Sequence, residues 1–196
     1  REVHHRVKNT LHSLLSMVTI RIAEPIHPQA KAILLDTLGA LESISKLYQN
    51  LNLQDPNQEI FVKPYFESLI QSILQINGKE NLISFSFQTQ ESLLTIKNLM
   101  PLGIIFNELI TNAIKYAFLN LPNQKNHIAI KLNQKEGFFV LEVQDNGQGL
   151  PDNFQLEKNQ GFGLMLVSML TQQLKGSFLI ENQNGVKTKA IIKKQG

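Results

Sequence analysis

The chain has 196 residues, of which 42% are hydrophobic and 18% charged, a composition that supports a buried core and excludes wholesale disorder. It contains no cysteine, which excludes disulfide bonds, thiolate zinc sites and a cysteine nucleophile and fits a reducing, cytoplasmic compartment. The net charge of +3 is small and the lysines are dispersed, so we expect no nucleic-acid binding, and because no apolar run could cross a bilayer we expect no membrane contact.

The first quarter of the chain predicts an antiparallel helical hairpin. Apolar residues recur at spacings of three and four over residues 3–23 and again over residues 29–51, with prolines between the two stretches. Such a hairpin has little core of its own, so we expect it to form a homodimer as a four-helix bundle or to pack on a neighbour. We assign residues 1–53 to this domain. Because the sequence starts inside a predicted helix, we also expect an upstream sensor domain in a longer protein.

A polar stretch at residues 52–59 reads as a linker, and the pattern then changes. In the second predicted domain, residues 60–196, helices and strands are mixed without regular alternation. This order favours an α+β fold, an α/β sandwich with helices on one face of a mostly antiparallel sheet. Helices are predicted at residues 64–76, 102–118 and 162–174, and strands at residues 83–88, 93–97, 128–133, 138–144, 177–181 and 188–193.

The helix predicted at residues 102–118 has an unusual polar face. Glu108, Asn112 and Lys115 lie at i, i+4 and i+7, on one side of the helix. A carboxamide oxygen suits Mg²⁺, an amine can meet phosphate charge, and a carboxylate can hold a metal-bound water. An ordinary amphipathic helix with a mixed polar face explains the same pattern equally well.

Two glycine-rich segments follow this helix. Residues 145–149, Asp-Asn-Gly-Gln-Gly, come directly after a predicted strand; they suit an ordinary turn, but Asp145 is also placed to accept a hydrogen bond from an exocyclic amine. Residues 161–164, Gly-Phe-Gly-Leu, precede a helix whose free N–H groups would face an anion. Neither segment matches a dinucleotide-binding or P-loop fingerprint.

The motif N-E-L-x-x-N-A-x-K-Y from Asn107, followed by the two glycine-rich segments in this order, resembles the ATP-binding domain of the GHKL superfamily of histidine kinases, Hsp90-like ATPases and type II topoisomerases. The resemblance covers roughly residues 60–194. It implies ATP and Mg²⁺ as cofactors, with Asn112 binding the metal and Asp145 accepting from the adenine amine. It further implies a mobile lid and a set of pocket residues, namely Gly147, Gly149, Gly161 and Gly163 in the lid, Lys115, Tyr116 and Leu164 on the pocket wall, and Glu108 as a catalytic residue.

Residues 2–11, E-V-H-H-R-V-K-N-T-L, resemble the phosphoacceptor helix of sensor histidine kinases with an H-R-x-K-N motif, a subclass related to HWE kinases. The resemblance identifies His5 as the phosphorylated residue. Periodicity agrees independently, because His4 lies at the edge of the apolar stripe whereas His5 points about 130° away from it. His12 also points outward, but nothing around it suggests chemistry.

One feature of this helix departs from related kinases, many of which have an acidic residue directly after the histidine. Here that position is Arg6. Glu2 lies one turn before His5, and our hypothesis is that it orients the imidazole ring. Lys8 and Asn9 flank His5 and are candidates to contact phosphate or a partner.

The sequence therefore predicts the core of a cytoplasmic sensor histidine kinase. It would transfer phosphate from ATP to His5 and then to an aspartate of a response-regulator receiver domain. Two alternatives stay open. A non-catalytic nucleotide-binding dimerisation scaffold is disfavoured by the intact Asn112, Asp145 and four glycines, and a serine kinase or ATPase of the same superfamily would leave His5 unexplained.

Overall fold

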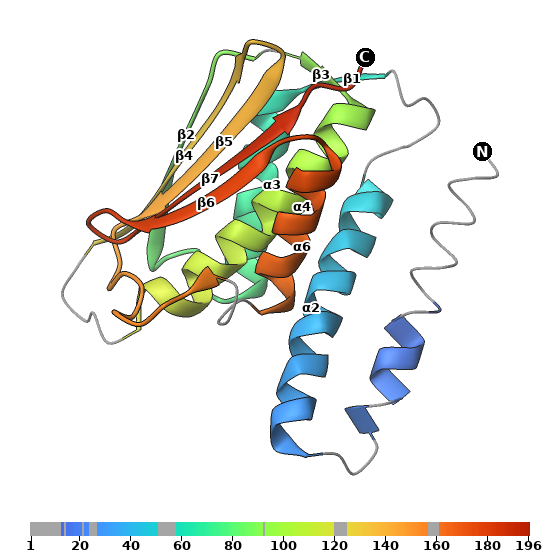
Figure 1. The fold of residues 1–196 in the computed structure, drawn as a ribbon, viewed down its shortest axis with the longest axis vertical. Helices are drawn as coiled ribbons and strands as arrows, with labels where there is room; N and C mark the ends of the chain where they lie inside the picture. Colours follow the sequence, from blue (N-terminus) through green and yellow to red (C-terminus); the bar gives the residue numbers. More distant parts are fainter. Residues whose placement is uncertain are drawn as a thin grey trace.

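The computed structural model describes residues 13, 15–20, 22–23, 27–50, 58–91, 93–119, 125–156 and 161–196. Residues 15–20 and 22–23 are helical and lie beside α2 (Pro28–Asn50) (Figure 1). The two helices run in opposite directions, which confirms the predicted antiparallel hairpin. Among the described helices, none is both long and apolar enough to cross a membrane.

The rest of the described chain is built on a five-stranded sheet with the order β2-β4-β5-β7-β6. Neighbouring strands are antiparallel except for β2 and β4, which are parallel, so the prediction of a mostly antiparallel sheet is confirmed. The strands are β2 (Ile83–Thr89), β4 (Asn126–Lys135), β5 (Phe138–Asp145), β6 (Ser177–Asn182) and β7 (Val186–Lys193).

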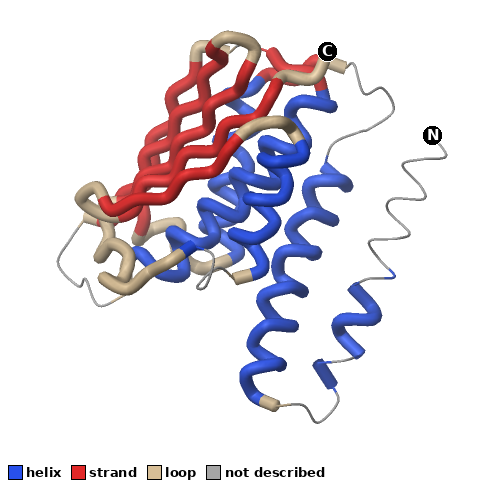
Figure 2. Tube along the Cα trace, viewed as in Figure 1, coloured by secondary structure: helices blue, strands red, loops and turns tan. Residues whose placement is uncertain are grey.

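Three helices cover one face of this sheet: α3 (Val62–Ile76), α4 (Ile96–Asn112) and α6 (Phe162–Gln173) (Figure 2). The other face of the sheet carries no helix in the described part of the chain. Helix α2 contacts α4 and α6 on their outer side, so the hairpin packs on the sandwich. The α+β architecture predicted from the sequence is therefore confirmed.

The core lies between the sheet and these helices. Alternate residues of β5 point inward, so Phe139 and Leu141 are fully buried. Helix α4 contributes most of the opposite wall, where Phe106 packs against Phe66 of α3 with ring centroids 4.8 Å apart. Burying a side chain of this size contributes about 1.5–3 kcal/mol relative to its exposure. The packing of these buried side chains fixes α4, including its C-terminal end, against the sheet.

The boundaries of α4 differ from the prediction in two ways. The strand expected at residues 93–97 is shorter, because β3 (Leu93–Thr95) ends where α4 begins, at Ile96 rather than at Leu102. The last turn is not α-helical: residues Ala113–Ala117 form a π-helix, η1. The earlier start buries Ile96, and the single proline inside the helix, Pro101, removes only one N–H from the helical ladder.

A second small sheet was not predicted. β1 (Glu59–Phe61) pairs with β3 in antiparallel register, with Glu59 opposite Thr95, although residue 59 was assigned to the linker. The amide of Ile96 also donates to the carbonyl of Gln58, over 3.0 Å. The short ribbon therefore ties the beginning of the second domain to the first turn of α4.

Candidate functional site

A cavity of about 390 Å³ opens at the C-terminal end of α4. Its walls come from α4 and η1, from the first turn of α6, and from the segment 148–154 that follows β5; β5, β6 and β7 contribute the floor. The apolar part of the lining includes Leu109, Val143, Leu150, Phe154 and Ile180. A flat organic group would be sandwiched by such side chains, while a few polar groups would fix its orientation.

Asp145 is the principal acidic group of the cavity. It is the last residue of β5 and points inward like Phe139 and Leu141, because it shares their alternation. Its Oδ1 accepts from the backbone amides of Gly147 (2.8 Å) and Val186 (3.1 Å), whereas no described residue donates to Oδ2. Burial raises the pKa of this carboxyl, and hydrogen bonds from the backbone amides of Val186, Gly147 and Asp145 itself oppose the shift. Oδ2 is left to accept a hydrogen bond from a ligand.

Asn112 is the last residue of α4 and lies on the cavity wall. Its Nδ2 is buried and has no hydrogen-bond partner in the described part of the chain. Buried amides are normally paired, so an unpaired one facing a cavity indicates a ligand or an ordered water. The choice between nitrogen and oxygen in an amide follows from its surroundings, and either assignment leaves an Asn112 amide atom unpaired.

This donor set fits Mg²⁺ bound together with phosphate. Mg²⁺ is commonly held by one or two protein oxygens, the substrate phosphates and several waters, so it needs no cage of side chains. The described residues contain no group of three or more His, Cys, Asp or Glu that could hold a metal ion by themselves. The amide oxygen of Asn112 would therefore supply the protein ligand, with phosphate and water completing the coordination.

The π-helical turn η1 directly follows Asn112 and contacts the segment that follows Asp145. Its carbonyls at Tyr116 and Ala117 accept from Gln148, through Nε2 (2.8 Å) and through the backbone amide (2.9 Å) respectively. Gly147 approaches Ala117 so closely that a Cβ would collide with the Ala117 carbonyl. π-Turns are frequent at functional sites. Here the turn receives the segment after β5 and so brings Asp145 and Asn112 to one cavity.

Glu108 and Lys115, the other two residues of the polar row, are not among the described residues that line the cavity. Glu108 is only 6% exposed; Asn107 Nδ2 donates to its Oε1 over 3.2 Å. The first turn of α6 lies over the carboxylate, and a Cβ on Gly163 would collide with Oε2. Lys115 is exposed on η1. The sequence placed Glu108, Asn112 and Lys115 on one side of the helix, but it did not predict that α6 would cover part of that side.

The remaining predicted pocket residues are placed as follows. Tyr116, Gly149, Gly161, Gly163 and Leu164 line the cavity together with Asn112 and Asp145, whereas Gly147 packs against Ala117 behind it. The residues of the predicted phosphoacceptor helix, namely Glu2, His4, His5, Arg6, Lys8, Asn9 and His12, lie outside the described residues.

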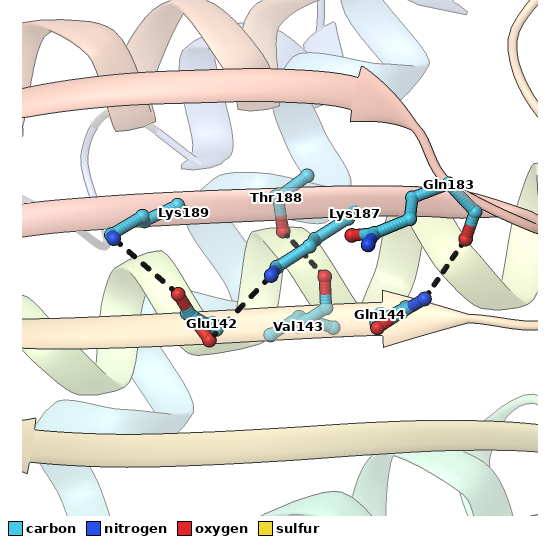
Figure 3. A network of polar contacts seen from close by, with 7 residues as sticks. All are labelled: Glu142, Val143, Gln144, Gln183, Lys187, Thr188 and Lys189. Atoms are coloured by element: carbon cyan, nitrogen blue, oxygen red, sulfur yellow. Dashed lines mark hydrogen bonds and ion pairs between the residues drawn. The ribbon is translucent and has the colours of Figure 1, made fainter.

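The sequence analysis missed Thr188, which lines the cavity and is 7% exposed. Its Oγ1 donates to the carbonyl of Val143 over 3.1 Å, across the β5–β7 pair (Figure 3). It stands on the inward face of β7 with Ala190 and Ile192. A single hydroxyl in an otherwise apolar alternation is the signal that would have identified it.

The fold and the cavity together define an ATPase-like α/β sandwich that follows a helical hairpin. A family model described as histidine kinase-, DNA gyrase B- and HSP90-like ATPase matches residues 98–195, which is half of the chain. A second model, HisKA_2, described as histidine kinase, matches residues 2–77. The chain thus belongs to the histidine kinase-, DNA gyrase B- and HSP90-like ATPase family and carries a histidine kinase region of the HWE-related type before it, as the motifs predicted.

Individual relatives agree with this assignment. The sensor histidine kinase PdtaS of Mycolicibacterium smegmatis is 25% identical over 178 residues, covering 90% of this chain and 35% of the relative. Blue-light-activated histidine kinase 2 of Erythrobacter litoralis is 24% identical over 178 residues, covering 88% of this chain and 50% of the relative. The chain therefore spans only a third to a half of these proteins.

Two solved structures share the fold. The histidine kinase domain of an Erythrobacter litoralis blue-light-activated histidine kinase superimposes with a TM-score of 0.68 at 20% identity, covering 98% of this chain and 89% of that one. The catalytic domain of the histidine kinase ThkA superimposes with a TM-score of 0.55 at 18% identity, covering 70% of this chain and 96% of that one. The first match extends over both the hairpin and the sandwich.

Proposed function

We propose that this chain is the kinase core of a cytoplasmic sensor histidine kinase, which phosphorylates His5 from Mg-ATP and passes the phosphoryl group to an aspartate of a response regulator. The proposal rests on one observation: the same cavity is lined by Asn112, whose amide has an unpaired atom, and by Asp145, whose described hydrogen bonds are all made by Oδ1, so that Oδ2 can accept from a ligand. The histidine kinase match to residues 2–77, which includes the H-R-V-K-N sequence, supports His5 as the acceptor.

Different residues of the cavity would bind different parts of the nucleotide. Asp145 Oδ2 accepts from the exocyclic amine of adenine, and apolar neighbours such as Val143 and Ile180 cover the faces of the base. The first turn of α6, capped by Gly161 without any side-chain hydrogen bond, directs its backbone N–H groups toward the phosphates. The metal would be held by Asn112 and would neutralise phosphate charge during transfer.

His5 supplies the nucleophile. In the neutral form of a histidine side chain, one ring nitrogen carries a free electron pair. That nitrogen forms a bond to the γ-phosphorus while the bond from phosphorus to the β–γ bridging oxygen breaks, so ADP leaves. The other ring nitrogen then releases its proton to solvent. Rate enhancement comes mainly from in-line placement and charge neutralisation. Glu2, one turn before His5, would orient the ring.

The relation to other parts of the signalling system follows from the same proposal. The phosphoryl group would be accepted by a receiver-domain aspartate, and the hairpin would form the homodimer interface. Exposed apolar side chains on both helices of the hairpin, Met17 and Ile20 on the first and Ile33 and Leu35 on α2, support such an interface. An upstream sensor domain would act on the first helix.

The decisive experiment is incubation with γ-labelled ATP and Mg²⁺, comparing the native chain with His5→Gln and with His4→Gln as a matched control. We expect acid-labile, alkali-stable label that disappears only in His5→Gln. Loss of label only in His4→Gln would move the acceptor to the neighbouring residue. Acid-stable, alkali-labile label would indicate a serine kinase, and ATP binding without label would indicate the nucleotide-binding scaffold. A Glu2→Gln variant with unchanged labelling would exclude the orienting role of Glu2.

A further inference from the structure

We propose that Asn182 is a positioning residue of the nucleotide cavity, which holds the cavity wall formed by residues 150–154 in register with Asp145. The inference rests on the proposed function, because it concerns how the same cavity binds ATP. Asn182 is the last residue of β6 and does not itself line the cavity. Any influence on the nucleotide must therefore act through the residues it holds.

The contact is a double hydrogen bond between one side chain and one backbone residue. The amide of Leu150 donates to Asn182 Oδ1 over 2.6 Å, and Asn182 Nδ2 donates to the carbonyl of Leu150 over 3.2 Å. This arrangement imitates the pairing of two strands, although Leu150 belongs to no strand. A two-point contact fixes both the position and the orientation of Leu150, which a single hydrogen bond would not do.

Gly149 shows how closely the chain passes Asn182. Its φ is +80°, and a Cβ built on it would lie 2.8 Å from Asn182 Oδ1. A side chain at this position would be strained in its backbone and would also displace the Asn182 amide. The glycine is thus needed for the contact, in addition to any role that it has toward phosphate.

Among the described residues, the other hydrogen bonds of this part of the chain lie within it or just before it. Leu150, Pro151 and Phe154 line the cavity, and within this stretch the amide of Phe154 donates to the carbonyl of Pro151 over 2.9 Å. Before it, Gln148 is bonded to η1 through its amide and its side chain. Asn182 is therefore the described contact that ties the wall to the sheet, while Gln148 ties the preceding residue to the helix.

The same hairpin end also holds Asp145. Asn182 pairs with Val186 across the β6–β7 turn, and the amide of Val186 donates to Asp145 Oδ1. Gln144 Nε2 donates to the carbonyl of Gln183 over 2.9 Å, which attaches this turn to β5 (Figure 3). The end of β6 and the β6–β7 turn thus contact both Asp145, which would bind the base, and Leu150, which begins the wall. Asn182 therefore links the position of Leu150 to that of Asp145.

The test compares Asn182→Leu, which removes both hydrogen bonds at similar volume, with Asn182→Asp, which keeps the acceptor for the Leu150 amide but loses the donor. Gln183→Ala is the matched control, because it removes the adjacent exposed side chain of the same turn, whose described bonds are made by its backbone. Mg-ATP dissociation constants, the KM for ATP and kcat of the labelling reaction, and melting temperatures are measured for all four proteins.

We expect Asn182→Leu to weaken ATP binding about tenfold, because the wall is no longer preorganised, and to raise the KM for ATP in parallel while kcat at saturating ATP changes less than about twofold. Asn182→Asp should recover part of the affinity, and Gln183→Ala should bind ATP like the native chain. A purely structural contact would instead lower the melting temperature and leave the affinity of the folded protein unchanged.

The inference is overturned if folded Asn182→Leu and Asn182→Asp bind ATP as tightly as Gln183→Ala, or if kcat falls while KM stays constant. If Asn182→Leu does not fold, the comparison of Asn182→Asp with Gln183→Ala decides by the same criterion. If the native chain itself binds no ATP, the proposed function fails and this inference fails with it. The first two results would leave the kinase proposal intact.

Discussion

Replacement of Asp145 by asparagine tests how the cavity recognises its nucleotide. The new side chain has the same shape, and its Oδ1 can still accept from the amides of Gly147 and Val186. In the proposed complex the group that changes is Oδ2, which becomes an NH₂ donor and would face the donor amine of adenine. The variant therefore loses one hydrogen bond to a charged acceptor, worth about 1.5–3 kcal/mol, or roughly 10- to 150-fold in dissociation constant.

The assay is calorimetric titration of the native chain and of Asp145→Asn with Mg-ATP and with Mg-ITP, whose base has a carbonyl in place of the amine. The native chain should prefer ATP, and the variant should lose or reverse that preference. If the substitution weakens ATP and ITP binding equally, Asp145 does not contact the amine and the assignment of the base end of the cavity is wrong.

The same substitution also tests how the free energy of unfolding depends on pH. Burial raises the pKa of Asp145 in the folded chain, so the folded state binds a proton more readily than the unfolded state does. The carboxyl thus adds to stability at low pH, and that contribution is lost as the pH rises from about 4 through the raised pKa. The free energy of unfolding of the native chain minus that of Asp145→Asn should fall over this range in urea titrations. An increase would show that the backbone donors outweigh burial.

Substitutions at three further positions give separable outcomes. Asn112→Leu removes a buried amide that lacks a partner, so unfolding free energy should hold or rise by about 1 kcal/mol while Mg²⁺-dependent ATP binding is lost; retained binding would contradict the metal assignment. Asn98→Ala removes the two hydrogen bonds to the backbone of Gln195, 2.8 and 3.0 Å long, and the 2.9 Å bond to Thr95 Oγ1. It should lower the free energy of unfolding by about 1–3 kcal/mol without changing ATP affinity. Gly163→Ala forces a Cβ onto the Glu108 carboxylate and should destabilise by about 1–3 kcal/mol; an unchanged melting temperature would show that α6 shifts freely.

The sequence predicted those elements whose apolar period is long enough to be unambiguous. β5, with its strict alternation, and α6 agree with the prediction within one residue. β1 was missed because three residues provide no period, and it is defined only by its pairing with β3. The start of α4 was placed too late because the run from Leu93 to Ile96 suits a strand and a helix equally well.

The sequence predicted those residues of the site that lie within short, recognisable motifs. Asp145 and Asn112 lie in short motifs and were identified directly, and both are on the cavity wall. Thr188 and Asn182 come from strands more than thirty residues further along the chain than Asp145, and only the antiparallel register of β5, β6 and β7 brings them close. The contact of α6 with Glu108 could not be predicted for a similar reason, because α6 belongs to a later segment of the chain.

The parallel pairing of β2 with β4 has a consequence for the order of folding. Ser84 of β2 contacts Asn126 across 42 residues of sequence, and the intervening chain contains β3, α4 and η1. By contrast, β4 and β5 are joined by a tight turn at residues 136–137. Closing the longer loop has the larger entropic cost, so we expect the antiparallel strands to associate first and β2 to add to their edge last. β2 and β6 are the two edge strands of this sheet, each bonded on one side only, so we expect their amide protons to exchange with solvent before those of β4, β5 and β7.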